Sequence, residues 1–251
     1  MLRGIWAACV LVVATIGCAL PAIAVTLLSR RGSDAVVRAG KIWSRILLAA
    51  VGARLTLRHP ERAREHHPCV FIANHQSMID VWAMFAVIPP STRFVAKREL
   101  FRIPVFGWAL SCSGFVPIDR DNRAEAIRSL RAAAEQIRAG RSVVLYPEGT
   151  RSRDGRLRPF KKGAFHLALQ ARVPIVPVVI TGSHAVLPPR SLRVRPGPVT
   201  VHLEPAIDAA RHAPDDVQGL LSEVQEVFRR RFEQPQPEAP GAALPGSAPR
   251  A

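Results

Sequence analysis

An uncharged and mainly apolar run, residues 4–29, opens the pattern of the chain. At about 1.5 Å per residue, a helix of this length could cross a hydrocarbon core about 30 Å thick. Most of the flanking basic residues follow the run, so the positive-inside rule predicts that its C-terminal side is cytoplasmic. A cleaved signal peptide is the alternative, because Ala22-Ile23-Ala24 has the small residues of a cleavage site. Pro21 leaves open a bent helix that lies in one leaflet.

Residues 34–53 have the periodicity of a second, amphipathic helix. Arg38, Lys41 and Arg45 share one face. The apolar residues cluster at roughly helical spacing: Val37, Ile42, Ile46, Leu47, Leu48 and Val51. A basic amphipathic helix beside an anchor suits an anionic membrane surface, and packing against a folded domain explains the same pattern equally well.

Short apolar runs then alternate with helical patterns. The predicted strands are residues 69–73, 93–96, 142–146, 175–180 and 199–203, and the predicted helices are residues 123–138, 162–171 and 215–232. This alternation predicts an α/β fold with a central, partly parallel sheet flanked by helices. An N-terminal hydrophobic membrane-attachment helix or helix pair precedes it.

Local signals refine this picture. Asp121 or Asn122 is placed to cap the helix that begins at residue 123, and Gly140 to end it. Prolines interrupt the apolar run 173–178, which therefore predicts an edge strand or an irregular one. The chain divides into an N-terminal anchor with an amphipathic helix (1–55), a folded domain (56–233) and a Pro/Ala-rich tail (234–251) that we expect to be disordered.

Composition narrows the classes of partner. The formal net charge of +16 favours polyanions such as anionic lipid surfaces, phosphorylated substrates or nucleic acid. Only four of the 35 basic residues are lysines, however, and such an arginine bias can reflect genome base composition. The chain has 15 aromatic residues, and no run of them is interleaved with basic residues, so nucleic acid is not an expected partner. The four cysteines lack C-x-x-C spacing, which favours a reducing compartment.

The first motif with chemical meaning follows the predicted strand 69–73 and runs from Asn74 to Asp80. Histidine is the side chain best suited to take a proton near neutral pH, and a carboxylate on its far ring nitrogen would fix the tautomer. With His75 at a strand end and Asp80 one turn into the next helix, the two side chains could meet. They would form a dyad that activates a hydroxyl belonging to the substrate.

A second motif, residues 146–152 (Tyr-Pro-Glu-Gly-Thr-Arg-Ser), follows the strand 142–146. Sites in α/β proteins usually lie at such strand-to-loop junctions. Arg151 offers a planar fork suited to phosphate, and Gly149 lets the backbone come close to a ligand. An ordinary polar turn is the alternative for this motif taken by itself. Two further stretches fit the same site: residues 114–120, which place Arg120 just past a strand, and the run 173–178.

These four stretches, in this order, resemble the four sequence blocks of the glycerolipid acyltransferase family. Residues 74–80 match its H-x4-D block, residues 118–120 its second, 147–152 its third and 173–177 its fourth. Residues 94–100, with Pro104 and Gly107-Trp108 beyond, look most like bacterial 1-acyl-sn-glycerol-3-phosphate acyltransferases. The similarity spans about residues 68–180. Tyr146 stands where the family usually has phenylalanine.

The resemblance implies that His75 deprotonates the acceptor hydroxyl, that Asp80 orients His75, and that no acyl-enzyme forms. Lys97, Arg120 and Arg151 would hold the acceptor phosphate. Glu148, Gly149 and Thr150 belong to the block that shapes this pocket. Glu148 is expected to align an arginine or a glycerol hydroxyl rather than to carry a proton.

The activity implied is transfer of an acyl group from acyl-CoA or acyl carrier protein to 1-acyl-sn-glycerol-3-phosphate, giving phosphatidic acid. No cofactor or metal is expected, and the pair His66-His67 is not a predicted metal site. The location implied is the bacterial inner membrane, with the catalytic domain on the cytoplasmic side. Other acceptors stay open: glycerol-3-phosphate, another lysophospholipid or an aminolipid. A His-Asp hydrolase, and a non-catalytic basic protein that binds membranes or nucleic acid, are the alternatives of other classes.

Overall fold

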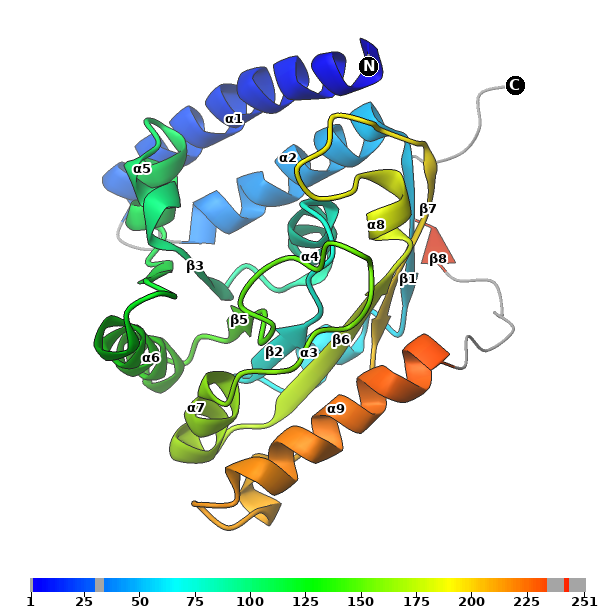
Figure 1. The fold of residues 1–251 in the computed structure, drawn as a ribbon. Coiled ribbons are helices and arrows are strands. Elements are labelled where there is room, and N and C mark those ends of the chain that lie inside the picture. Colours follow the sequence, from blue (N-terminus) through cyan, green and yellow to red (C-terminus); the bar gives the residue numbers. More distant parts are fainter. Residues whose placement is uncertain (1, 30–33, 234–241, 244–251) are drawn as a thin grey trace.

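The computed structural model describes residues 2–29, 34–233 and 242–243. These residues form one eight-stranded sheet with helices on both faces (Figure 1). The strands are β1 (Ala53–Arg58), β2 (Val70–Ala73), β3 (Arg93–Lys97), β4 (Val116–Ile118), β5 (Val143–Leu145), β6 (Ile175–Thr181), β7 (Gly197–Leu203) and β8 (Ala242–Ala243). The α-helices are α1 (Leu2–Leu28), α2 (Ala35–Val51), α3 (Arg62–Glu65), α4 (Ile79–Val87), α5 (Phe106–Cys112), α6 (Arg123–Arg138), α7 (Gly163–Ala171), α8 (Ser183–Val186) and α9 (Val217–Glu233).

The sheet is mostly parallel, as the sequence predicts. The strand order is β4-β3-β5-β2-β6-β7-β1-β8, and the first five strands in this order are parallel neighbours. Strand β7 pairs antiparallel with β6 and parallel with β1. The carboxyl ends of parallel strands meet at one edge of a sheet, so the loops after β2, β4 and β5 share that edge. These loops carry the first three motifs of the sequence.

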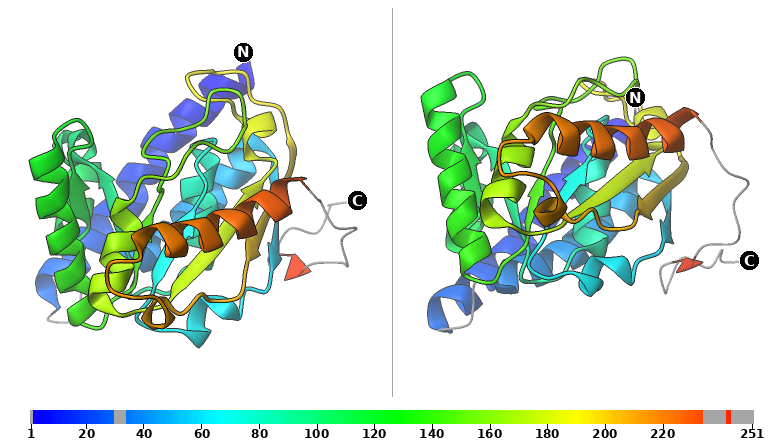
Figure 2. Two further views of the ribbon diagram at one scale, coloured as in Figure 1. Left: turned by 60° about the horizontal axis from the view of Figure 1, so that its bottom comes forward. Right: turned by 90° about the horizontal axis from the view of Figure 1, so that it is seen from below.

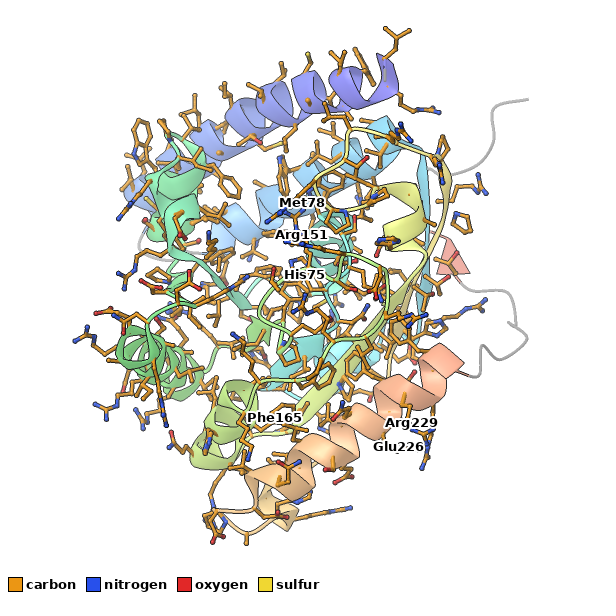
Figure 3. The ribbon with its side chains drawn as sticks, viewed as in Figure 1. His75, Met78, Arg151, Phe165, Glu226 and Arg229 are labelled. Atoms are coloured by element: carbon orange, nitrogen blue, oxygen red, sulfur yellow. The ribbon has the colours of Figure 1, made fainter. Side chains whose placement is uncertain are left out.

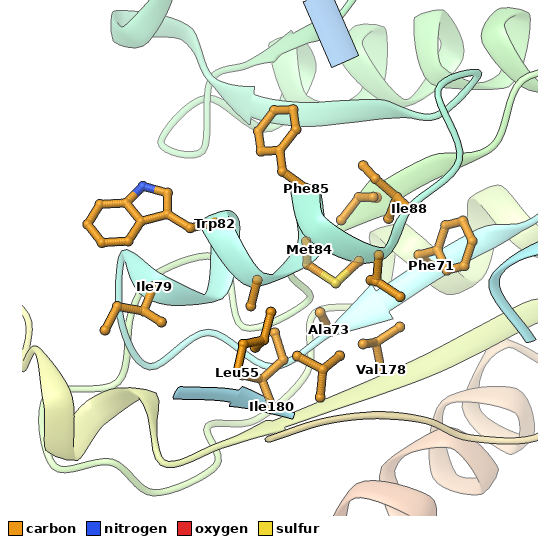
Figure 4. Close-up of a cluster of buried hydrophobic side chains, with 14 of the residues drawn as sticks. Leu55, Phe71, Ala73, Ile79, Trp82, Met84, Phe85, Ile88, Val178 and Ile180 are labelled. Atoms are coloured by element: carbon orange, nitrogen blue, oxygen red, sulfur yellow. The ribbon is translucent and has the colours of Figure 1, made fainter. Parts of the chain in front are cut away.

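The two faces of the sheet pack against different helices because successive side chains of a strand point to opposite sides. Phe71 and Ala73 of β2 join the core shared with α2 and α4 (Figure 4). Val70 and Ile72 join the core shared with α6, α7 and α9, and α9 crosses this second face in Figure 2. The buried strand β2 therefore ends at a place that helices cover on both sides.

Local signals explain two of the elements. Helix α6 has the predicted bounds, and the side chain of Asn122 caps it by accepting the Glu125 N–H at 3.2 Å. Of the two alternatives predicted for residues 173–178, an edge strand or an irregular one, the edge strand is wrong, because β6 lies between β2 and β7. Pro177 is tolerated there because it lies just past the last antiparallel pair, Val178 with Leu203, and its carbonyl still accepts the Glu204 N–H at 2.9 Å.

Helix α1 packs along α2 and α5 and leaves most of its surface uncovered (Figure 1). It buries only small residues, Gly4, Ala14, Ala19 and Ala22. Among the described residues it is the one helix long and apolar enough to cross a membrane. Its exposed large side chains are Leu2, Ile5, Trp6, Val12, Val13, Ile16, Leu20, Val25, Leu27 and Leu28.

Helix α2 packs on α4 and buries part of the predicted apolar cluster, including Val37, Leu47 and Val51. Ile42 and Ile46 of the same cluster are exposed instead, because they lie on the opposite side of the helix. Packing against the folded domain therefore accounts for one face of α2. The predicted disordered tail, residues 234–251, lies outside the described residues except for β8, which pairs with β1.

Candidate active site

The loop after β2 is clamped to the neighbouring strand by Asn74. Its side-chain amide donates to the Ile180 carbonyl at 2.8 Å and accepts the Ile180 N–H at 2.7 Å. This pair of bonds lies just past the last pair of β2 with β6, Ala73 with Val178. The backbone of the next residue, His75, therefore has a fixed position at the carboxyl edge of the sheet.

The structure brings His75 and Asp80 together. His75 Nδ1 lies 3.0 Å from Asp80 Oδ2, and Asp80, in the first turn of α4, is fully buried. The same oxygen accepts the N–H groups of Gln76 at 2.6 Å and Ser77 at 2.7 Å. Because an ionised carboxylate only accepts hydrogen bonds, Nδ1 carries the hydrogen and Nε2 carries the lone pair.

Two further contacts hold His75. Its ring stacks on Tyr146, with centroids 4.2 Å apart and planes at 26°. Its carbonyl accepts the Ser152 N–H at 2.8 Å. About 10% of its side chain is exposed, and no described residue hydrogen-bonds Nε2. The imidazole is therefore fixed in orientation, with its basic nitrogen left for a ligand; Figure 3 shows its place near the middle of the molecule.

Glu148 braces the same loop through main-chain groups. One carboxylate oxygen accepts the His75 N–H at 2.6 Å, and the other accepts the Arg158 N–H at 3.1 Å. Burial raises the pKa of Glu148 to about 7; the Asp80 charge also raises it, and the two backbone donors oppose the rise. Glu148 thus holds two backbone N–H groups, and its predicted alignment of an arginine or a glycerol hydroxyl stays a prediction. No sequence motif distinguishes those donors.

A cavity of about 560 Å³ opens beside Tyr146, between α6, α7 and the loops after β4 and β5. Its basic lining residues are Arg120, Arg123, Lys161, Lys162 and His166, and its apolar ones include Val95, Ile118, Ile127, Leu130 and Leu145. The Arg120 guanidinium donates to the Gly149 carbonyl. The Lys161 ammonium lies over Gly149, 3.1 Å from where a Cβ atom would stand. Gly149 also has a φ of +71°, a backbone conformation that favours glycine.

Arg151 lies close enough to Arg120 for their charges to interact. Burial lowers the pKa of Arg120, and the Arg151 charge lowers it further. Arg151 is half-buried and, in the view of Figure 3, lies between His75 and the helices α1 and α2. Two of the three predicted phosphate-binding cations therefore lie near the dyad.

The remaining predicted residues lie further out. Lys97 is half-exposed, pairs with Glu99 at 3.1 Å and does not line the cavity. Thr150 is exposed at the end of the motif that holds Glu148 and Gly149. The structure thus gathers His75, Asp80, Glu148, Gly149 and Arg120, with Arg151 close by, and leaves Lys97 at the surface, where it pairs with Glu99.

Sequence reasoning gave no role to Lys161, which lines the cavity, or to the stacking of Tyr146 on His75. A signal existed for the first, because Lys161 and Lys162 are half of the four lysines in the chain. Within residues 2–29, 34–233 and 242–243, no group of three or more His, Cys, Asp or Glu side chains is arranged to hold a metal ion.

Comparisons with known proteins agree on one family. A family model described as acyltransferase matches residues 54–181. A 1-acyl-sn-glycerol-3-phosphate acyltransferase of Salmonella typhimurium is 33% identical over 207 residues, covering 82% of this chain and 83% of that protein. The enzyme of the same name from Cocos nucifera is 40% identical over 163 residues, 64% of this chain and 52% of its own length.

A solved structure has the same fold. The 1-acyl-sn-glycerophosphate acyltransferase PlsC from Thermotoga maritima superposes with a TM-score of 0.82 at 24% sequence identity. The superposition covers 95% of this chain and 96% of that one, so the N-terminal helices and the sheet domain share one arrangement in both proteins.

Proposed function

The chain belongs to the acyltransferase family, and from this premise we propose that it transfers a fatty acyl group to the free hydroxyl of 1-acyl-sn-glycerol-3-phosphate, giving phosphatidic acid. The donor is an acyl thioester, either acyl-CoA or acyl carrier protein. The observation that carries the proposal is the buried His75–Asp80 pair, whose Nε2 has no partner among the described residues and whose imidazole stacks on Tyr146, a lining residue of the cationic cavity.

In the proposed mechanism His75 is the general base. Nε2 takes the proton of the acceptor hydroxyl while the hydroxyl oxygen attacks the thioester carbonyl carbon. The tetrahedral intermediate collapses with loss of the carbon–sulfur bond, and the imidazolium returns the proton to the departing thiolate. Asp80 keeps its negative charge throughout and stabilises the imidazolium. Only the two substrates exchange a covalent bond, so the enzyme needs no nucleophile of its own.

Arg120 and Arg151 are the proposed ligands of the acceptor phosphate. Both are guanidinium groups, whose geometry matches phosphate oxygens. Gly149 accepts a hydrogen bond from Arg120 through its carbonyl and lies beneath the Lys161 side chain. Lys97 has no part in this proposal, because Glu99 pairs with it outside the cavity. Glu148 has a positioning role, since it holds the backbone of His75.

We place the protein on a bacterial inner membrane with its catalytic domain on the cytoplasmic side. The support is the row of large apolar side chains that α1 leaves exposed, which Trp108 and Ile103 near α5 extend. The acceptor and the product are both lipids, so a site attached to the bilayer meets them without extraction into water. The basic residues that follow α1 favour the cytoplasmic orientation.

The test is an assay of purified protein in lipid vesicles with lysophosphatidic acid and labelled acyl-CoA, repeated with acyl carrier protein as donor. His75→Ala should lose about 10²- to 10⁴-fold in kcat, as expected for loss of a general base. His66→Ala is the matched control, because His66 is exposed and lies outside the site. Near-normal transfer by His75→Ala would refute the mechanism.

The same assay separates the alternatives. Glycerol-3-phosphate, a lysophospholipid with a larger headgroup and an aminolipid are offered as competing acceptors. Release of free fatty acid without an acceptor would indicate a hydrolase. Absence of any transfer, together with salt-sensitive retention on DNA, would indicate a non-catalytic basic protein.

A further inference from the structure

The cavity between α6 and α7 holds more positive charge than one phosphate needs. Four fixed cations line it, Arg120, Arg123, Lys161 and Lys162, together with one carboxylate of the described residues, Asp121. The lining therefore has a net charge of +3 before His166 is counted. A phosphate monoester carries a charge between about −1.5 and −2 at pH 7, which Arg120 and Arg151 together balance. The charges of Arg123, Lys161 and Lys162 are then left for a second anion.

These three side chains also lack protein partners. None of them forms a hydrogen bond or an ion pair with another side chain in the part of the chain that the structure describes. Two other arginines beside α6, Arg98 and Arg128, both pair with Glu125. Cations that are gathered without counter-charges repel one another, so the arrangement at the cavity favours the binding of an anion.

The interior of the same cavity is apolar. Val95 and Leu145 line it and are buried, whereas Arg123 and Lys162 are exposed and therefore stand at its mouth. Its volume of about 560 Å³ lies within the range of about 300–1,000 Å³ that is usual for small-molecule sites. An apolar interior with a cationic mouth suits a ligand that has an extended, weakly polar part and an anionic end.

The sheet separates this cavity from the apolar helix α1. Val95 and Leu145 belong to the core shared with α6, α7 and α9, whereas Ala14 of α1 belongs to the core of the opposite face. Figure 1 shows α1 above the sheet and α7 below it. With α1 attached to the bilayer, the cavity lies on the aqueous side of the sheet. A water-soluble substrate reaches it there, while a lipid substrate arrives from the side of α1.

We propose that this cavity binds the acyl donor, with Arg123 and Lys162 contacting the phosphate of its phosphopantetheine arm and the apolar interior taking the arm itself. Coenzyme A and acyl carrier protein both carry the thioester on this arm, so its phosphate is common to the two donors. Tyr146 lines the cavity and stacks on His75, so the thioester end of the arm meets the dyad beside this residue. This inference rests on the proposed function and adds to it the place where the donor binds.

The double variant Arg123→Gln with Lys162→Gln is the test. Both side chains are exposed, so the fold is expected to survive their replacement. KM for the acyl donor should rise about tenfold, with kcat within about twofold of wild type and KM for lysophosphatidic acid unchanged. Salt at roughly 0.5 M should reduce the difference, because exposed charges are screened. Arg131→Gln is the matched control, since Arg131 is exposed on the same helix and does not line the cavity.

The assay is run with acyl-CoA and, separately, with acyl carrier protein as donor. A rise in KM is expected with each donor that the wild type uses, because both have the same arm. If the wild type uses both donors and KM rises with acyl-CoA alone, the cations contact the phosphates of the nucleotide. That result would overturn the assignment to the shared arm.

A binding measurement gives a readout that needs no turnover. The Kd of free coenzyme A and of the phosphopantetheine form of acyl carrier protein, measured by calorimetry without acceptor, should rise about tenfold in the double variant for each one that wild type binds. An unchanged Kd, or wild type that binds neither, would overturn the inference.

Two kinetic results would also overturn it. A rise in KM for lysophosphatidic acid with an unchanged KM for the donor would mean that the cavity binds the acceptor. Kinetics equal to those of Arg131→Gln would mean that neither substrate contacts these cations. In both cases wild type still transfers acyl groups, so the failure is separate from that of the proposed function, which fails only if wild type transfers none.

Discussion

Replacing Asp80 by asparagine isolates the electrostatic part of the mechanism. Asp80 Oδ2 accepts three hydrogen bonds, from His75 Nδ1 and from the N–H groups of Gln76 and Ser77. Its other oxygen, Oδ1, has no partner in the described part of the chain. An asparagine with its carbonyl oxygen in the Oδ2 position keeps all three bonds, and its amide group takes the unpaired position. The loop and the histidine tautomer are therefore expected to stay as they are.

What is lost is the charge opposite the imidazolium. With Nδ1 and Oδ2 3.0 Å apart, the two charge centres lie at roughly 4 Å, where opposite charges attract by about 4 kcal/mol at an effective dielectric constant of 20. Since each 1.36 kcal/mol in the barrier is a factor of ten in rate, Asp80→Asn should lower kcat about 10³-fold. KM should change little, because Asp80 is buried away from the cavity.

The assay follows thiol release from acyl-CoA with lysophosphatidic acid in vesicles, over a range of pH. Circular dichroism and the unfolding temperature check that the variant is folded. Asp80→Ala is the comparison, because it also removes the acceptor of all three bonds and should lower stability as well as rate. If Asp80→Asn keeps kcat within about threefold of wild type, the carboxylate does not stabilise an imidazolium and the reasoning fails.

Three further predictions concern neighbouring residues. Arg151→Ala should raise KM for lysophosphatidic acid about tenfold or more and leave KM for monoacylglycerol unchanged. Arg193→Ala is the control, because Arg193 is exposed, and it should change neither KM. An equal effect on both acceptors would mean that Arg151 does not bind the phosphate. Because the folded pKa of Glu148 is raised to about 7, its contribution to stability is complete below its unfolded value near 4.5 and is lost as the pH rises to 7. Between these pH values the free energy of unfolding of the wild type, measured in urea, should therefore fall by up to about 3 kcal/mol relative to that of Glu148→Gln. An equal pH dependence of this free energy in the two proteins would contradict the prediction. Asn74→Ala should lower the free energy of unfolding by about 2–4 kcal/mol, because it leaves the backbone N–H and carbonyl of Ile180 unpaired. A change below about 0.5 kcal/mol, measured by urea unfolding, would contradict this role of Asn74.

The sequence predicted the parts of the fold that depend on local patterns. Helix α6 has a cap, a periodic face and a glycine after its end, and its bounds agree with the prediction. The dyad was predictable because a strand end and the first turn of the next helix lie close together whatever the rest of the fold does. The interior place of β6 was not predictable, since the tolerance of Pro177 depends on where its neighbour β7 ends.

The site was harder to predict where it depends on contacts between distant segments. Glu148 binds the backbone of His75, and main-chain N–H groups look alike in every sequence. The family resemblance implied a phosphate-binding role for Lys97, but in the structure Glu99, two residues further on, pairs with it. The stacking of Tyr146 on His75 was passed over because it is visible only when both loops are placed.

The residues that hold the His75 loop in place are synthesised after helix α1. The loop is held by Ile180, by Glu148 and, through Ser77, by the carbonyl of Leu187, which is 110 residues further along the chain. Helix α1 precedes the loop and these partners along the chain, so it can meet the bilayer while the loop still lacks them. A nascent chain can therefore attach to the membrane before its active site has assembled. A chain truncated before Leu187 would bind the membrane but would have no activity.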